Sequence, residues 1–362
     1  MTEHLVRERT APTDSAPPTK RRRGRPILEV SGLTVDYLTD RGPVRSCNEI
    51  DLTLHEREIV GVAGESGSGK STLITALTRL QRPPAVTVGG SITYHSPDKG
   101  PVELTSLHDA ALRRLRWNEI AIVLQSAMDC LNPVMRLGDQ FADALREHNR
   151  GASKKAVKDR IAELLEMVGV PADRARSYPH ELSGGMRQRS LIALALACEP
   201  RIVVMDEPTT AVDVVMQRQI LAQLLSLQDR LGFAVVFVTH DLSLLVQLAD
   251  RIAIMYAGRI VEEASAEQIY RDPLHPYARG LRDAFPSLHA PLTDLSGIGG
   301  NPPDLRNPPS GCPFHPRCAQ RLESCSSELP LLTTIGDRRV ACHLYDGSET
   351  ELPDEPSRRS AR

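Results

Sequence analysis

Two short glycine-rich stretches constrain this chain more than any other feature. The first runs Gly64-Glu65-Ser66-Gly67-Ser68-Gly69-Lys70-Ser71-Thr72 and fits the pattern G-x-x-x-x-G-K-[ST]. Its glycines let backbone N–H groups close around phosphate oxygens, Lys70 is placed to neutralise the β- and γ-phosphates, and the Ser71 hydroxyl is placed to bind Mg²⁺. This stretch alone predicts a site for a nucleoside triphosphate.

The second stretch is Leu182-Ser183-Gly184-Gly185-Met186. It places a hydroxyl and two glycines just before a predicted helix over residues 187–198. A helix N-terminus with free N–H groups is a second place where an anion can bind. Two phosphate-binding ends in one chain suggest that they serve two different nucleotides, each shared with a neighbouring chain.

Polar side chains end three short apolar runs, at residues 120–125, 201–207 and 234–240. Such runs predict buried parallel strands. The runs end in Gln125, in Asp206 with Glu207, and in His240. Because ligands bind at the carboxyl ends of strands in open α/β sheets, these side chains are expected to surround one nucleotide. Asp206 is placed to hold Mg²⁺, Glu207 to orient or deprotonate a water, and His240 to reach a γ-phosphate.

Taken in order, these motifs resemble those of the ATP-binding subunit of an ABC transporter, over about residues 28–263. The resemblance implies an α/β fold, with a P-loop ABC ATPase core over 27–263 and a helical subdomain over about 126–183. The helical subdomain would dock on membrane subunits, with the segment 125–141 lining the groove. In this reading the motifs are Walker A at 64–72, the Q-loop at Gln125, the signature at 182–186, Walker B at 203–207, the D-loop at 210–213 and the switch histidine His240.

The resemblance also implies a composite site. ATP would be sandwiched between Walker A of one subunit and the signature of its partner, and hydrolysis would reopen the dimer. The catalytic residues would be Glu207, His240 and Gln125, and the Mg²⁺ ligands Ser71, Gln125 and Asp206. Tyr37, near the end of a predicted strand over 28–38, would stack on adenine, although an ordinary strand aromatic explains it too. The other nucleotide-binding residues would be Gly64, Ser66, Gly67, Ser68, Gly69, Lys70, Ser71, Thr72, Ser183, Gly184, Gly185 and Asp213.

Length, net charge and hydrophobicity limit the partners and the location that this chain can have. Its 362 residues suffice for one large domain and a smaller one, and its net charge of −2 gives no general case for nucleic-acid binding. No apolar run approaches the ~20 residues that span a bilayer. The termini, 1–26 with its basic run and 349–362, are expected to be disordered tails; weak attraction of the basic run to an anionic membrane is the alternative. We therefore expect a peripheral protein at the cytoplasmic face of the cell membrane.

Residues 264–348 extend beyond the ATPase core. Three stretches, at 275–281, 300–305 and 307–318, resemble the C-terminal extension of the oligopeptide/dipeptide-importer branch of ABC ATPases. The resemblance implies import of di- or oligopeptides, with nickel or another small solute as the alternative. The implied partners are a second ATPase subunit, identical or a paralogue, two membrane permease subunits and an extracytoplasmic peptide-binding protein.

Four of the seven cysteines lie in this extension: Cys312, Cys318, Cys325 and Cys342. In a cytosolic protein such clustering favours metal over disulfides. The wide C-x₅-C-x₆-C-x₁₆-C spacing lacks the paired C-x₂-C of common zinc sites. It favours a [4Fe–4S] cluster, with Zn²⁺ or plain structural thiols as alternatives. Cys47, Cys130 and Cys198 are expected to be small buried apolar residues.

Two other function classes fit the sequence less well. ABC ATPases that act on nucleic acid carry long coiled-coil insertions or two cassettes in one chain, and neither is present here. A small P-loop kinase or GTPase would leave the stretch 182–186 and His240 unexplained. Transport therefore remains the preferred reading.

Overall fold

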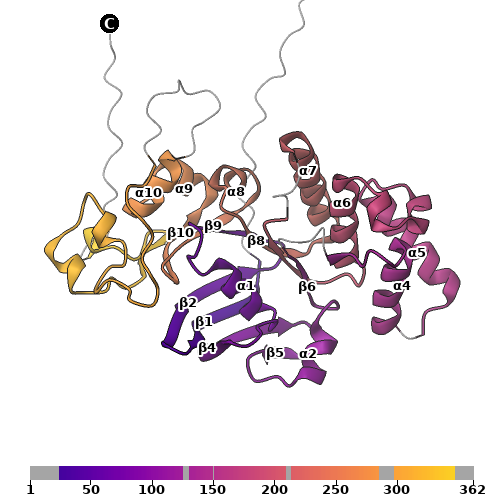
Figure 1. Cartoon of the computed structure of the whole chain (residues 1–362), viewed down its shortest axis with the longest axis horizontal. Coiled ribbons are helices and arrows are strands. Elements are labelled where there is room, and N and C mark those ends of the chain that lie inside the picture. Colours follow the sequence, from indigo (N-terminus) through magenta and orange to yellow (C-terminus); the bar gives the residue numbers. More distant parts are fainter. Residues whose placement is uncertain (1–23, 125–129, 150, 209–212, 285–296, 347–362) are drawn as a thin grey trace, which may run out of the picture.

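The computed structural model describes residues 24–124, 130–149, 151–208, 213–284 and 297–346. In these ranges two β-sheets form the centre, a group of helices lies at one end and the C-terminal extension lies at the other (Figure 1). None of the helices described there is long and apolar enough to cross a membrane. The arrangement confirms the expected α/β fold.

The smaller sheet is antiparallel and has the strand order β2-β1-β4-β5. The strand predicted over 28–38 is β1. It carries Tyr37 near its end, and β2 carries Ser46, so this sheet supplies one side of the site described below. The bounds are β1 (Pro26–Thr39), β2 (Gly42–His55), β4 (Ala85–Ser96) and β5 (Gly100–Glu103).

The larger sheet has the order β11-β12-β10-β9-β3-β8-β7-β6. Its central strands β9, β3, β8, β7 and β6 are parallel, and every residue of β3, β7 and β8 is buried, as their continuous apolar sequences predict. All three predicted strand tips therefore point to the same edge. The bounds are β3 (Ile59–Ala63), β6 (Ile120–Val123), β7 (Ile202–Asp206), β8 (Ala234–Val238), β9 (Arg251–Tyr256) and β10 (Arg259–Ser265).

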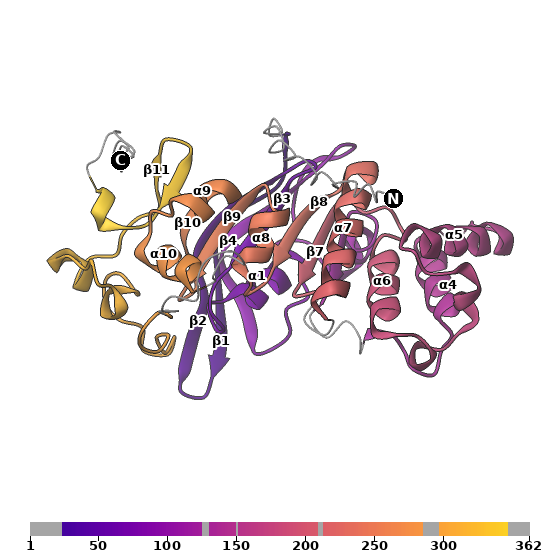
Figure 2. The ribbon, with the colours of Figure 1, turned by 90° about the horizontal axis from the view of Figure 1, so that it is seen from above.

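Helices α4, α5 and α6 form the group at one end of the molecule, beside α7 (Figures 1 and 2). Helices α4 and α5 lie within the span expected to form the helical subdomain, and Ser153 caps α5 by accepting the Ala156 N–H at 3.1 Å. The helix bounds are α1 (Lys70–Leu77), α2 (Asp109–Leu115), α4 (Leu137–His148), α5 (Lys154–Met167), α6 (Gly184–Ala195), α7 (Val214–Leu231), α8 (Leu242–Leu248), α9 (Ala266–Arg271) and α10 (Pro276–Asp283).

One predicted boundary was wrong. The helix expected to begin at residue 187 begins at Gly184, because the Ser183 hydroxyl accepts the Met186 N–H at 3.2 Å and starts the helix across both glycines. Their poor helix propensity is outweighed by this cap and by packing.

The C-terminal extension adds strands to one edge of the larger sheet. Strands β9 and β10 form an antiparallel hairpin, β12 (Arg338–Val340) pairs with the outer edge of β10, and β11 (Thr333–Ile335) pairs with β12. The extension thereby covers a sheet edge that would otherwise expose unpaired backbone groups. It is thus joined to the ATPase core by backbone hydrogen bonds.

Candidate active site

The glycine-rich loop between β3 and α1 is shaped by close backbone contacts. Gly64 has φ +156°, and a Cβ built there would lie 2.2 Å from the Met255 carbonyl oxygen. Gly69 has φ +105°, and a Cβ there would lie 2.2 Å from the carbonyl oxygen of Ser46. Both positions therefore require glycine. The backbone of the loop can therefore keep this conformation only with glycine at these two positions.

Lys70 is buried at the start of α1. Its Nζ donates hydrogen bonds to the carbonyl oxygens of Gly64 at 2.7 Å and Glu65 at 2.9 Å. Burial lowers the pKa of Lys70, while the charges of Glu207 and Asp206 oppose that shift. An ammonium group held in this way gains a partner of opposite charge when phosphate enters.

An open cavity of about 470 Å³ lies over this loop. The size of the cavity, the Lys70 ammonium and the Ser71 hydroxyl in its lining fit a triphosphate and its Mg²⁺. The lining residues are Ser46, Ser66, Gly67, Gly69, Lys70, Ser71, Thr72, Glu207 and His240.

Glu207 and His240, at the tips of two adjacent strands, line the same cavity, and Asp206 lies next to Glu207 in the chain. Burial raises the pKa of Asp206, and a hydrogen bond from Ser71 opposes that shift, so the two expected Mg²⁺ ligands touch. Glu207 has φ +44°, which is strained for a residue with a side chain. Its N–H donates to the Val238 carbonyl at 2.8 Å, and its Oε1 lies 2.9 Å from His240 Nδ1.

Tyr37 and Ser46 reach the other side of the loop from the smaller sheet. The Tyr37 hydroxyl lies 3.3 Å from the Thr72 hydroxyl, and the Ser46 hydroxyl lies 2.8 Å from it. Tyr37 is thus adjacent to the loop, and adenine stacking stays a prediction. Sequence analysis missed Ser46, because an isolated serine in a strand carries no recognisable signal.

The signature residues lie elsewhere in the chain. Ser183 and Gly184 begin α6, on the helical side of the molecule and away from α1 (Figure 1). The cavity lining over the described residues includes neither of them nor Gly185. Asp213 caps α7 by accepting the Met216 N–H at 2.9 Å. Gln125 and the D-loop positions 210–212 lie outside the described residues.

The four cysteines of the extension converge only partly. Burial, together with the neighbouring thiols of Cys312, Cys318 and Cys325, raises the pKa of Cys342 to about 12. The Cys312 N–H donates to the Cys325 carbonyl at 2.9 Å. Yet among the described residues no group of three or more His, Cys, Asp or Glu side chains is arranged to hold a metal ion. The four thiols are the type of ligand that a [4Fe–4S] cluster takes, but they are not arranged as such a cluster requires.

The remaining cysteines differ from expectation at one position. Cys47 is buried, as predicted, and burial raises its pKa to about 12. Cys198 is half-buried. Cys130 is exposed, so its reading as a buried apolar residue was wrong.

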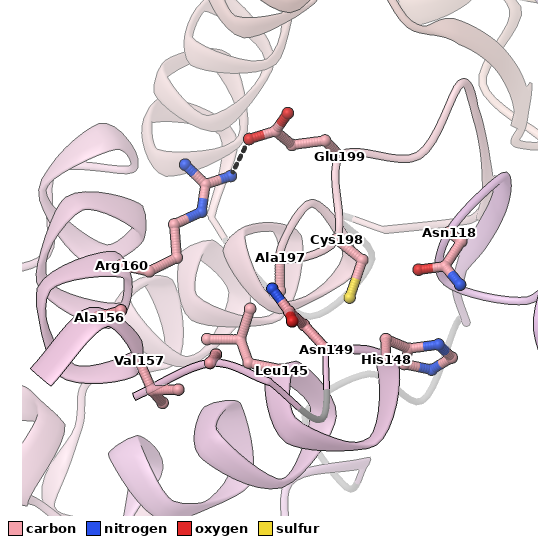
Figure 3. Close-up of a pocket in the computed structure, with 11 residues that line it drawn as sticks. Asn118, Leu145, His148, Asn149, Ala156, Val157, Arg160, Ala197, Cys198 and Glu199 are labelled. Carbon is pink, nitrogen blue, oxygen red and sulfur yellow. Dashed lines mark hydrogen bonds and ion pairs between the residues drawn. The ribbon is translucent and has the colours of Figure 1, made fainter. Parts of the chain in front are cut away.

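A second hollow, of about 420 Å³, lies in the helical group (Figure 3). The end of α4 supplies Leu145 and His148, and α5 supplies Val157 and Arg160, whose guanidinium lies 2.8 Å from Glu199. Trp117 stacks on His148 with ring centroids 6.3 Å apart. The other lining residues are Asn118, Asn149, Ala152, Ala156, Ala197 and Cys198.

This hollow differs from the groove expected along 125–141. Within the described part of that segment, Leu131 is buried in the core, whereas Val134 has 80% of its surface exposed. Whether the segment contacts another protein stays a prediction.

Comparison with known proteins gives two family matches. Residues 47–210 match the family model described as ABC transporter. Residues 261–325 match the model described as oligopeptide/dipeptide transporter, C-terminal region. The first match lies within the expected ATPase core, and the second runs from the end of that core into the extension.

Similar proteins match over most of their length. The dipeptide transport ATP-binding protein DppD of Caldanaerobacter subterraneus subsp. tengcongensis is 40% identical, over 88% of this chain and 97% of that protein. A putative peptide import ATP-binding protein of Brucella abortus is 42% identical, over 88% and 94%. Among solved structures, the dimeric ABC transporter cassette MJ0796 is 28% identical with a TM-score of 0.59, over 66% of this chain and 99% of that one. A post-hydrolysis state of the same cassette, bound to ADP and Pi, gives the same values.

Proposed function

The chain belongs to the ABC transporter ATP-binding proteins, in the oligopeptide/dipeptide-transporter branch, and we propose that it hydrolyses ATP to power import of di- or oligopeptides through a membrane complex. One observation carries the proposal. The phosphate-binding loop and the bonded pair Glu207–His240 line one cavity, Asp206 is hydrogen-bonded to Ser71 of that loop, and the chain also carries the extension of peptide-importer relatives.

Each residue of the site has its own role in ATP hydrolysis. Lys70 and the loop N–H groups bind the β- and γ-phosphates, and Ser71 and Asp206, with Gln125 from outside the described residues, would hold Mg²⁺. Bound Mg²⁺ neutralises charge that develops on the phosphate oxygens. Glu207 orients or deprotonates the attacking water. His240 holds the Glu207 carboxylate in place and faces the γ-phosphate end of the cavity.

We infer that the complete site forms between two ATPase subunits. Ser183 and Gly185 lie away from the loop of their own chain, and the related cassette MJ0796 was solved as a dimer. In a dimer of this kind the start of α6 would face the partner's nucleotide, where its N–H groups favour a phosphate. The second subunit is an identical copy or a paralogue.

The hollow of Figure 3 supports docking on membrane permease subunits. Its lining combines the apolar side chains of Leu145 and Val157 with polar groups such as Asn118 and Arg160. Such a surface fits a short amphipathic helix of a partner. We propose that this contact holds the chain peripherally at the cytoplasmic face of the membrane, with an extracytoplasmic peptide-binding protein delivering the solute.

We also propose that Cys312, Cys318, Cys325 and Cys342 hold a [4Fe–4S] cluster. The support is the mutual influence of the four thiols, together with the burial of Cys312, Cys325 and Cys342. Metal binding would release the thiol protons and order a segment with little apolar core. Iron and sulfide analysis of anaerobically purified protein tests this, with Cys318→Ser expected to remove the iron and Cys130→Ser to retain it. Stoichiometric zinc would instead support the alternative metal, and neither metal would leave plain thiols.

The function is tested in the complex reconstituted with its native partners in vesicles. Peptide supplied with the binding protein should stimulate ATP turnover and accumulate inside the vesicles. Stimulation by nickel or another solute, with none by peptides, would refute the peptide assignment. A salt-dependent gain in ATP turnover on adding nucleic acid would refute the transport assignment.

A further inference from the structure

The second residue of the phosphate-binding loop is held by the C-terminal extension. Two terminal nitrogens of Arg317 donate hydrogen bonds to the two carboxylate oxygens of Glu65, at 2.7 Å and 2.9 Å. The arginine side chain is 6% exposed and that of Glu65 is 24% exposed. A paired contact of this kind fixes orientation as well as distance, and the partial burial strengthens it.

Arg317 is itself held rigidly. Its Nε donates to the Gly299 carbonyl at 2.8 Å, and one terminal nitrogen donates to the Ile298 carbonyl at 3.2 Å. Its guanidinium lies 5.9 Å from the ring centres of both Tyr256 and Phe314. The side chain is therefore positioned by the folded extension before it meets the loop.

The backbone of Glu65 is held at the same time. Its N–H donates to the Tyr277 hydroxyl at 2.8 Å, and its carbonyl accepts the Lys70 ammonium at 2.9 Å. Pro302, Pro303 and Leu305 of the extension lie against the outer side of the loop. Every polar group of Glu65 is thus engaged, and the carboxylate and the N–H are engaged by residues that follow the ATPase core.

We infer that Arg317 is a positioning residue for ATP binding, acting through Glu65 on the loop that carries Lys70. This inference depends on the proposed function, because it assumes that the loop binds ATP. Without the contact, the first turn of the loop is free to change conformation, and bound ATP must order it again at a cost in affinity. Glu65 does not line the cavity, and Glu207 and His240 lie at other strand tips. The chemical step should therefore be spared.

The test compares Arg317→Gln with a matched control, Arg306→Gln. Arg306 lies in the same extension, but its ion pair with Asp304 is exposed. In the full chain assembled with its partners, Arg317→Gln should raise the KM for ATP and the Kd of MgATP about tenfold, the loss expected for a hydrogen-bonded charge pair. The kcat at saturating ATP should stay within about twofold. Arg317→Lys, which keeps the charge but not the paired geometry, should recover part of the affinity.

The contact can also be broken from the loop. Glu65→Gln should reproduce the KM shift, and the double variant should be no worse than either single variant, because both remove one interaction. If Arg317→Gln does not fold, the KM for ATP of Glu65→Gln tests the inference instead. An unchanged KM in the folded variants, a loss confined to kcat, or an equal shift in Arg306→Gln overturns the inference. Failure of the wild-type chain to bind MgATP would overturn the proposed function instead.

Discussion

His240 Nδ1 lies 2.9 Å from Glu207 Oε1, although the two residues follow different strands, β8 and β7. Both side chains line the cavity above the phosphate-binding loop. The glutamate that is proposed to act on water is thus oriented by the histidine. The two residues should behave as one catalytic unit.

Replacing Glu207 by Gln should preserve the shape of the site and remove its base. General-base loss costs ~10²–10⁴ in rate, so ATP turnover of the assembled complex should fall by that range while ATP still binds. His240→Ala should also slow turnover, and the double variant should lose little more than Glu207→Gln alone, because the histidine acts largely through the glutamate. Steady-state phosphate release measures these rates.

Glu267→Gln is the matched control, because Glu267 lies on α9, does not line the cavity, and makes an exposed ion pair with Arg271. It should leave turnover unchanged. Near-normal turnover in Glu207→Gln would remove Glu207 from the mechanism.

Lys70→Ala should act on nucleotide affinity as well as turnover. The ammonium offsets phosphate charge at the centre of the loop, and its loss leaves the loop carbonyls of Gly64 and Glu65 facing the phosphates. Calorimetric titration with MgATP should show binding weakened at least tenfold, a loss of about 1.4 kcal/mol or more. Lys155→Ala, on the exposed face of α5, should bind as the wild type does. Equal affinities for both variants would show that the loop does not bind phosphate as proposed.

Much of the site could be predicted because parallel strands constrain it strongly. Once the runs ending in Asp206–Glu207 and His240 are taken as neighbouring strands, their tips must lie at one edge of the sheet. The structure places them on adjacent β7 and β8 beside Lys70. No knowledge of individual side-chain contacts was needed for that step.

The contacts made by the extension could not be predicted in this way. Arg317 and Glu65 are 252 residues apart, and neither lies in a periodic element whose neighbours could be inferred. The pairing of β12 with β10 joins residues about 80 positions apart through strands of only a few residues. Short segments rich in proline carry too little hydrophobic pattern to fix their partners.

Ser183→Ala tests the shared site without adding volume. A side chain at Gly185 would be ambiguous, because its Cβ would lie 2.6 Å from Met216 Sδ in the same chain. The Ser183 change should reduce ATP-dependent dimer formation in the Glu207→Gln background, measured by size-exclusion chromatography, while ATP still binds its own loop. Ser153→Ala is the control, because it also removes a helix-capping hydroxyl, worth ~1 kcal/mol, on α5. Equal dimer formation by the two variants would contradict the shared site.

Replacing the buried Arg251 should lower the free energy of unfolding much more than breaking an exposed ion pair. It is buried between β9, β3 and β10, where it bonds Glu58 at 2.9 Å and also contacts Glu263. Arg251→Met leaves two buried carboxylates short of a partner, and breaking such a network costs about 3–5 kcal/mol. Arg271→Ala breaks an exposed pair with Glu267 and should cost under about 1 kcal/mol. Urea unfolding followed by circular dichroism compares them, and similar midpoints would contradict the expected difference.

Two buried groups, Glu262 and His275, have pKa values shifted in opposite directions. Burial raises the pKa of Glu262 to about 7. The N–H groups of Leu274 and His275, which donate to its carboxylate, and the charges of Arg338 and Arg279 oppose this shift. Burial, aided by the charge of Arg279, lowers the pKa of His275 to about 3. Between about pH 4.5 and 6.5, Glu262 is protonated in the folded chain and ionised in the unfolded chain. In the same window His275 is neutral in the folded chain and protonated in the unfolded chain. The two contributions to the pH dependence of stability therefore cancel in this window.

Single substitutions should expose each contribution. In Glu262→Gln only His275 remains, so stability relative to wild type should fall as the pH drops below 6.5, by up to about 1.4 kcal/mol per pH unit. In His275→Asn, where the amide oxygen can still accept the Tyr277 N–H that His275 Nδ1 accepts at 3.0 Å, only Glu262 remains. Stability relative to wild type should then fall as the pH rises from 4.5 towards 7, because the buried carboxylate must ionise. Urea midpoints at half-unit steps from pH 4.5 to 8 measure both slopes, and parallel profiles for the two variants would show that these groups do not titrate as described.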